Sequence, residues 1–169
     1  MTTPNPSRRN FLRGNFRATE SDVMRPPGAV PDFDRVCTEC GDCVSACPEG
    51  ILVNGPDKRP LVDFDKGACT FCVACVEACP SGALNPETAH IWDWRAEVSE
   101  GCLSMQGVTC RTCEDVCEPQ AIRFRLAKAG KSYPVIDLNQ CSGCGACAHS
   151  CPASAISFEK HIPSGKGQQ

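Results

Sequence analysis

Residues 141–152 read Cys-Ser-Gly-Cys-Gly-Ala-Cys-Ala-His-Ser-Cys-Pro, in which four cysteines and a closing proline follow the spacing C-x2-C-x2-C-x3-C-P. The same spacing occurs at residues 37–48 and at residues 69–80. A fourth copy, residues 102–119, is stretched, because seven residues separate its first two cysteines and its last cysteine is followed by Glu-Pro. These four groups contain all 16 cysteines of the chain, which indicates a single chemical purpose.

This spacing is typical of bacterial [4Fe–4S] proteins, in which three cysteines hold one cluster and the fourth ligates the neighbouring cluster. We therefore expect the groups to work in crossed pairs. Three clusters follow from the regular runs. A fourth requires the seven-residue spacer to fold back; otherwise the stretched group would be an open site whose cysteines only pack. The expected ligand sets are set one (Cys37, Cys40, Cys43 and Cys79), set two (Cys69, Cys72, Cys75 and Cys47), set three (Cys141, Cys144, Cys147 and Cys117) and set four (Cys102, Cys110, Cys113 and Cys151).

The composition favours metal as the element that holds the fold together. Leu, Ile, Val and Phe make up about a fifth of the chain, which is little for a domain held by aliphatic packing alone. Disulfides are one alternative, but the short repeated spacers bring four sulfurs to one point rather than joining distant segments. Zinc is another, although structural zinc sites use paired C-x2–4-C with a longer gap between the pairs.

Charge and motif content exclude several classes of function. The formal net charge is −3 with neutral cysteines, and four clusters with thiolate ligands would lower it to roughly −11. Such a charge disfavours nucleic acid as a partner. No apolar run approaches the length of a membrane span. No nucleophile–base pair, phosphate-binding loop or flavin motif stands out, so we expect electron transfer or cluster handling and not a substrate-converting enzyme.

The chain is organised as a repeat. The first cysteines of the groups recur at intervals of 32, 33 and 39 residues, which is typical of repeated structural units. We expect a loop-rich α+β fold of two tandem ferredoxin-like modules. Hairpins should form in the apolar stretches that follow the groups at 37–48 and 102–119, and a short helix should follow each Cys-Pro. The expected division is a basic, mostly disordered tail (1–31), a first module (32–90), a second module (91–160) and a frayed end (161–169).

Two kinds of residue near the cysteine groups invite a specific role. Gly41, Gly143 and Gly145 lie inside the ligand loops, where small residues let backbone N–H groups approach the sulfurs. Trp92 and Trp94 alternate as on a strand, which would place both rings on one face. We expect these rings to cover the core or a cluster, with a partner-docking surface as the alternative.

The basic tail carries one specific motif. Residues 7–13 read Ser-Arg-Arg-Asn-Phe-Leu-Arg, which matches the core of a twin-arginine export signal. The apolar segment that an export signal needs does not follow. We therefore interpret Arg8, Arg9, Phe11 and Leu12 as part of a recognition arm that binds a partner. A solvated, disordered tail is the alternative.

Together these features resemble the NapF family, the ferredoxin-type proteins encoded with periplasmic nitrate reductase systems. The resemblance covers the whole chain, and the tail motif, the long spacer and Cys-Glu-Pro make it more specific than the cysteine runs alone. The matching stretches are the tail motif, Arg-Pro-Pro at 25–27, the two regular cysteine groups, Ala-His-Ile-Trp-Asp at 89–93, Cys-Glu-Pro-Gln-Ala-Ile at 117–122 and Cys-Pro-Ala-Ser-Ala-Ile at 151–156.

The resemblance implies a cytoplasmic iron–sulfur accessory protein. Its partner would be NapA, the catalytic subunit of nitrate reductase, in the form that has not yet been exported. The protein would assist maturation of that subunit through cluster assembly or electron supply, and the arm would mimic the export signal of its client. The alternative is a polyferredoxin that carries electrons between a quinol-oxidising complex and the reductase.

Overall fold

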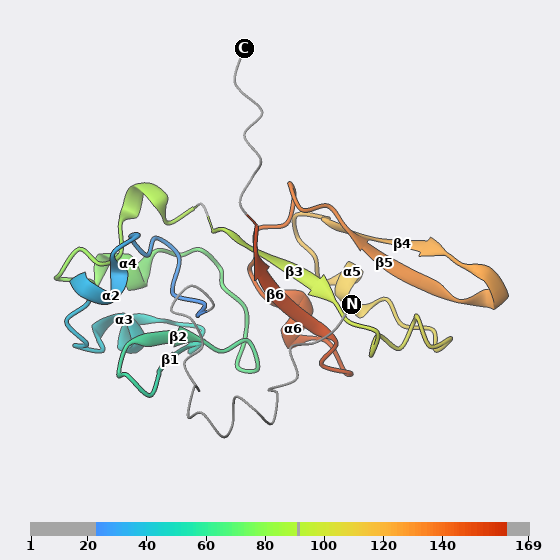
Figure 1. The fold of residues 1–169 in the computed structure, drawn as a ribbon, viewed down its shortest axis with the longest axis horizontal. Helices are drawn as coiled ribbons and strands as arrows, with labels where there is room; N and C mark the ends of the chain where they lie inside the picture. The colour runs from blue at the N-terminus through green and yellow to red at the C-terminus, as the bar shows by residue number, and fades with distance from the viewer. Residues whose placement is uncertain (1–22, 91, 162–169) are drawn as a thin grey trace, which may run out of the picture.

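The computed structural model describes residues 23–90 and 92–161. Its elements are few and short, as expected for a loop-rich α+β fold (Figure 1). The arm residues Arg8, Arg9, Phe11 and Leu12, and the end at 162–169, lie outside the described residues. In chain order the elements are α2 (Phe33–Val36), α3 (Asp42–Ala46), β1 (Leu52–Asn54), β2 (Pro60–Val62), α4 (Ala74–Glu77), η2 (Pro86–Thr88), β3 (Trp94–Val98), α5 (Thr112–Asp115), β4 (Ile122–Leu126), η3 (Lys128–Gly130), β5 (Ser132–Ile136), α6 (Ala146–His149) and β6 (Ile156–Lys160).

The strands form three antiparallel pairs. Two of them, β1–β2 and β4–β5, are the hairpins expected from the sequence. The N–H of Gly55 donates to the carbonyl of Arg59 at 2.8 Å, so the first turn is longer than two residues. The third pair joins β3 to β6, with Trp94 opposite Lys160, and it brings together the two ends of the second half of the chain.

The prediction of a helix after each Cys-Pro is wrong. The helices α3, α4, α5 and α6 each begin between the second and third cysteine of a group and end before its fourth cysteine. A proline disfavours helical geometry in the residue before it, and Cys47, which precedes Pro48, has an extended ψ of 111°. The proline therefore ends a helix instead of starting one. A turn follows it, in which the N–H of Gly50 donates to the carbonyl of Cys47 at 3.1 Å.

The apolar core lies around the cysteines in two clusters. The first contains Phe33, Ile51 and Leu84, and the second contains Ala96 and Ile122. Cysteine side chains belong to both clusters, so the core encloses the predicted ligand sets. The buried members that carry sulfur are Cys43, Cys113 and Cys147.

Both tryptophans are buried, as expected for a core role, with Trp92 6% and Trp94 7% exposed. Only Trp94 belongs to a strand, because β3 begins at that residue. Trp92 precedes the strand and packs edge-on against the rings of Phe64 and Phe71.

Residues 23–31, named here the strap, do not belong to a disordered tail. The guanidinium of Arg25 contacts the carboxylates of Asp34 at 2.8 Å and Asp57 at 3.1 Å. Pro26 is fully buried. The predicted tail, residues 1–31, therefore included residues that pack on the first half. The ion pairs of Arg25 and the burial of Pro26 and Pro27 attach the strap there. No helix in the described part of the chain has the length and apolar character to cross a membrane.

Candidate metal centres

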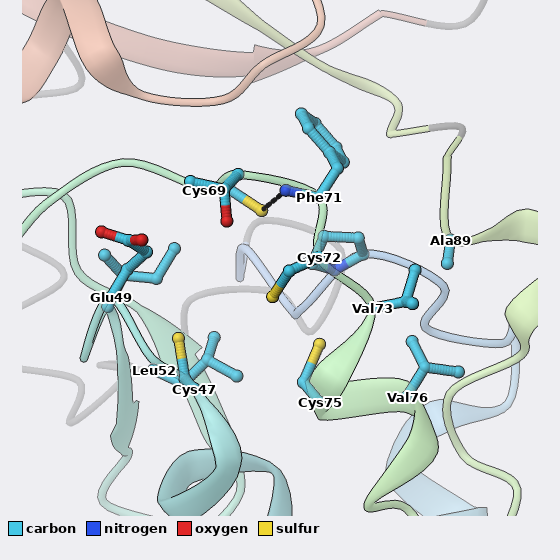
Figure 2. A pocket seen from close by; sticks show the side chains of 13 residues that line it. Cys47, Glu49, Leu52, Cys69, Phe71, Cys72, Val73, Cys75, Val76 and Ala89 are labelled. Carbon is cyan, nitrogen blue, oxygen red and sulfur yellow. Dashed lines mark hydrogen bonds between the residues drawn. The ribbon is translucent and has the colours of Figure 1, made fainter.

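The thiols of set two surround one hollow. Cys69, Cys72 and Cys75 come from the second group, whereas Cys47 comes from the first. Figure 2 shows the sulfurs of Cys47, Cys72 and Cys75 facing a common space, which Leu52 borders. The empty volume of the hollow, which includes space open to solvent, is about 430 Å³. The fold therefore brings together the cysteines of two groups in the crossed arrangement.

Sets one and four have the same arrangement. All four cysteines of set one line a hollow of about 310 Å³, and all four of set four line one of about 360 Å³. In set four, the seven-residue spacer does fold back: the N–H of Val108 donates to the carbonyl of Leu103 at 3.0 Å, and that of Gln106 to the carbonyl of Cys102 at 3.2 Å. Because the three hollows are similar in size, the stretched group provides room comparable to that of the regular ones.

Set three gathers around Cys147, which is buried. Burial and then the nearby thiols of Cys144, Cys141 and Cys117 raise its pKa. The described structure thus places the cysteines of each set near one another, and their ligation of clusters stays a prediction. Within residues 23–90 and 92–161, no three His, Cys, Asp or Glu side chains converge closely enough to hold a single metal ion.

The electrostatics of the sets fit a cationic core. Burial, with repulsion between neighbouring sulfurs, raises the pKa of Cys147 to about 12 and that of four other cysteines to about 11. Without metal these thiols stay neutral at pH 7, because several thiolates in one buried hollow would repel each other. An iron–sulfur core supplies the positive charge that permits deprotonation. The four others are Cys43, Cys69, Cys75 and Cys113.

Backbone N–H groups donate to several sulfurs. The N–H of Ala121 lies 3.3 Å from the sulfur of Cys117, and that of Ala155 lies 3.4 Å from the sulfur of Cys151. Both donors come four residues after the last cysteine of a group, in the turn that ends each repeat. Such bonds stabilise negative charge on sulfur and tune the reduction potential of a cluster. The sequence analysis missed these donors, although the alanine at this position recurs in both groups.

Hydrogen bonds also affect the thiol of Cys79 in set one. Burial raises its pKa, but bonds from Ser81 and from the backbone N–H groups that follow outweigh burial, so that the pKa falls below 9.0. In set two, the N–H of Phe71 donates to the sulfur of Cys69 at 3.4 Å (Figure 2). The sets therefore differ in how strongly the protein stabilises thiolate.

Within each half of the chain, the two sets are neighbours. The thiol of Cys75, in set two, contributes to the raised pKa of Cys43 in set one. In the second half, the thiol of Cys113, in set four, contributes to the raised pKa of Cys147 in set three. Sets one and two form one pair, and sets three and four form the other.

The two halves meet through the ligand loops of sets two and three, a contact named here the junction. The N–H of Cys69 donates to the carbonyl of Cys144 at 2.7 Å. The ring of Phe64 packs on Gly145 and lies 4.7 Å, between centroids, from the ring of Phe158. The four sets are therefore connected in the order one, two, three, four.

The glycines of the ligand loops have a different role from the expected one. A Cβ at Gly145 would overlap the ring of Phe64, and a Cβ at Gly143 would overlap the carbonyl of Trp94. The close approach that these two glycines permit is thus to the junction and to β3. Gly41 has no neighbour within 4 Å of such a Cβ.

Comparisons with known proteins agree with this arrangement. Residues 35–84 and residues 108–155 each match the family model of a 4Fe-4S dicluster domain. The chain is 43% identical over 169 residues to the ferredoxin-type protein NapF of Haemophilus influenzae, and this alignment covers 94% of the chain and 96% of the relative. The chain belongs to the NapF family of ferredoxin-type proteins. It is a [4Fe–4S] electron-transfer protein and not a substrate-converting enzyme.

Other relatives extend the comparison. NapF of Escherichia coli K12 is 42% identical over 155 residues, covering 90% of this chain and 94% of the relative. The methylamine utilization ferredoxin-type protein MauM of Methylophilus methylotrophus is 34% identical over 157 residues, covering 81% of this chain and 70% of the relative. The similarity is therefore greater, in identity and in coverage, to the NapF proteins.

Proposed function

We propose that each of the four sets holds one [4Fe–4S] cluster and that the chain conducts electrons between its two halves. The ligands would be the sixteen cysteines in their crossed sets. A bound cluster supplies one-electron oxidation and reduction without bond making at the protein. The observation that carries the proposal is the hydrogen bond from the Cys69 N–H to the Cys144 carbonyl, because it connects the ligand loops of two sets in different halves.

We further propose that the chain serves NapA, the catalytic subunit of periplasmic nitrate reductase, in the cytoplasm before that subunit is exported. Membership of the NapF family supports this partner. The twin-arginine motif of the arm supports recognition of an unexported client, with Arg8, Arg9, Phe11 and Leu12 as the binding residues.

The crossed sets favour electron supply over cluster donation as the way in which the chain assists maturation. Every set takes ligands from two separate groups, so releasing a cluster would require two loops to open together. The buried Cys43, Cys113 and Cys147 would also have to become exposed. Electron supply requires neither change.

The second candidate is a polyferredoxin that carries electrons between a quinol-oxidising complex and the exported reductase. The connected order of the four sets favours this function equally. The two candidates differ in their need for the arm, since a carrier should keep its role without residues 1–22, which end before the strap, whereas a factor that docks on an unexported client should not.

The test is capture of NapA that retains its export signal by the anaerobically purified holoprotein. Arg8→Ala with Arg9→Ala should weaken capture at least about tenfold. Lys58→Ala with Lys66→Ala removes the same charge from exposed positions outside the arm and should change capture less than about twofold. Equal capture by both variants would contradict recognition through the arm, and absence of capture by the unaltered chain would exclude this partner.

A further inference from the structure

The hairpin β4–β5 with its turn, residues 122–136, is a local concentration of positive charge and is named here the basic hairpin. It contains four cations and no acidic residue, although the chain as a whole has a net charge of −3. Figure 1 shows it extending away from the rest of the second half. The cations are Arg123, Arg125, Lys128 and Lys131.

One face of the basic hairpin is exposed and of mixed character. In the strand register, Arg123 lies opposite Val135 and Arg125 opposite Tyr133, so that these four alternate residues share a face. Tyr133 and Val135 are each 41% exposed. Arginine and tyrosine beside apolar side chains are the residue types that contribute most at protein–protein interfaces.

Most of this positive charge is uncompensated. Arg123 lies 4.0 Å from the carboxylate of Glu114. Arg125, Lys128 and Lys131 have no acidic side chain within 4.0 Å among the residues that the structure describes. The basic hairpin is thus complementary in charge to an acidic surface.

The corresponding hairpin in the first half is covered. Its strands β1 and β2 have three residues each, and the strap crosses it: Val62 donates its N–H to the carbonyl of Met24, and Arg25 donates to the carbonyl of Pro60, both at 3.2 Å. The strands of the basic hairpin have five residues each, and the spacer of the stretched group contacts it at its turn end, where the N–H of Ser132 donates to the carbonyl of Ser104 at 3.5 Å, leaving Arg123, Tyr133 and Val135 exposed. Two equivalent hairpins of one repeat therefore differ in length and cover.

The basic hairpin also borders set four. Phe124, on its inner face, lines the hollow of set four. Arg125 and Leu126 line a second groove that reaches Cys110. A protein bound at the basic hairpin would therefore lie beside the last set of the connected order.

We propose that the basic hairpin docks an acidic surface of a partner protein and places it beside set four for electron transfer. One electron leaves the iron–sulfur group of set four, which is oxidised, and reduces a one-electron acceptor in the partner; no bond is made or broken. The electron direction and the choice of probe rest on the proposed function. The overall negative charge disfavours nucleic acid and anionic lipid, which would meet only one small basic surface.

The test compares two charge reversals of equal size in the holoprotein. Arg125→Glu with Lys131→Glu changes the basic hairpin, and Lys58→Glu with Lys66→Glu changes exposed lysines of the first half. The probe is purified NapA that retains its export signal, with affinity measured by biolayer interferometry at low and high salt. The hairpin variant should bind at least about tenfold more weakly and lose most of its salt dependence, and the control less than about twofold more weakly.

Equal effects of the two variants on affinity, or no effect of either, would overturn the docking surface. Binding of NapA by the unaltered chain would still support the proposed function. If the unaltered chain does not bind NapA, the proposed function fails, and photo-crosslinking in cells decides on the surface. A crosslinker in place of Tyr133, but not of Lys66, should then attach to a protein segment rich in Asp and Glu. Three outcomes would overturn the docking surface. They are an adduct at position 133 no stronger than at position 66, an adduct with a basic protein segment, and binding to phosphatidylglycerol vesicles that depends on the basic hairpin.

Discussion

Cys147 and Cys79 show that the fold shifts the pKa of single thiols in opposite directions. Burial raises the pKa of Cys147 to about 12, whereas hydrogen bonds lower that of Cys79 below 9.0. Thiolate is both the metal ligand and the nucleophile. In the metal-free, reduced chain, we therefore expect iodoacetamide at about pH 8 to label Cys79 first and Cys147 last. Peptide mass spectrometry under anaerobic conditions measures the two rates in metal-free chain that circular dichroism shows to be folded, and equal rates in that folded chain would contradict the burial of set three.

The same shift has a consequence for stability. A thiol whose pKa is raised in the folded chain stabilises the fold below its unfolded pKa of about 9, and that contribution is lost as pH rises toward the folded value. The metal-free chain should therefore unfold at lower urea concentration at about pH 10.5 than at about pH 8. Circular dichroism measures the midpoint, and an unchanged or higher midpoint would contradict the raised pKa of the buried cysteines.

At the residue scale, the sequence predicted which cysteines gather and missed why certain glycines stand between them. Spacers of two and three residues allow local spacing to predict the sets, and the ligation of clusters by these sets stays a prediction. The role of Gly145 depends on Phe64, which is distant in the sequence and belongs to no periodic pattern. Such a contact becomes visible only in the folded chain.

At the scale of elements, the hairpins followed from turn residues and apolar stretches, whereas the helices did not. Proline can occupy the first turn of a helix or end the helix before it, and in the cysteine groups the helices lie before the proline and not after it. The strap likewise lies within the predicted tail, because prolines such as Pro26 and Pro27 break regular structure and so resemble a disordered segment in the sequence. Their burial beside Arg25 shows that an irregular segment can still be part of the core.

The strap provides a prediction of stability. Arg25→Ala removes ion pairs to Asp34 and Asp57 and a bond to the carbonyl of Pro60 from a guanidinium whose side chain is only 11% exposed. We expect a loss of about 2 kcal/mol, because charged groups that are partly buried lose their partners. Thermal unfolding of the holoprotein, followed by cluster absorbance, measures the loss.

The control for the strap is Arg35→Ala. Arg35 pairs with Asp32, but both side chains are exposed, so we expect a change within about 0.5 kcal/mol. Equal destabilisation by the two substitutions would show that the strap does not support the first half as described.

At the scale of the whole molecule, the junction joins the two modules, and under the proposed function it makes them one electron path. The sequence predicted two tandem modules and did not predict how they meet, because Cys69, Cys144, Phe64 and Gly145 carry no signal of their mutual contact. The division of the chain at residues 90 and 91 stays a prediction. What the structure adds is the order of the sets.

The junction predicts a difference between two glycine substitutions. Gly41 and Gly145 occupy the same position before a helix, with φ of 81° and 86°, so alanine strains the backbone similarly at both. Val73 occupies that position in the second group with φ of 58°, so a side chain is tolerated there. Only at Gly145 would the new Cβ meet Phe64. We expect Gly145→Ala to separate the halves.

The readout is the electron paramagnetic resonance spectrum of the dithionite-reduced holoprotein, at equal iron content. Gly145→Ala should lose the part of the spin–spin broadening that arises across the junction, while Gly41→Ala should keep the spectrum of the unaltered chain. Identical spectra for all three proteins would mean that the junction does not connect sets two and three electronically.

The most direct measurement of the central claim is the iron and sulfide content of the anaerobically purified chain beside that of Cys102→Ser. Four crossed sets predict about 16 irons and about 16 sulfides per chain, and about a quarter less of each after Cys102→Ser, because set four loses a ligand. A content of about 12 irons that Cys102→Ser leaves unchanged would contradict the fourth cluster, and with it the account of four connected sets.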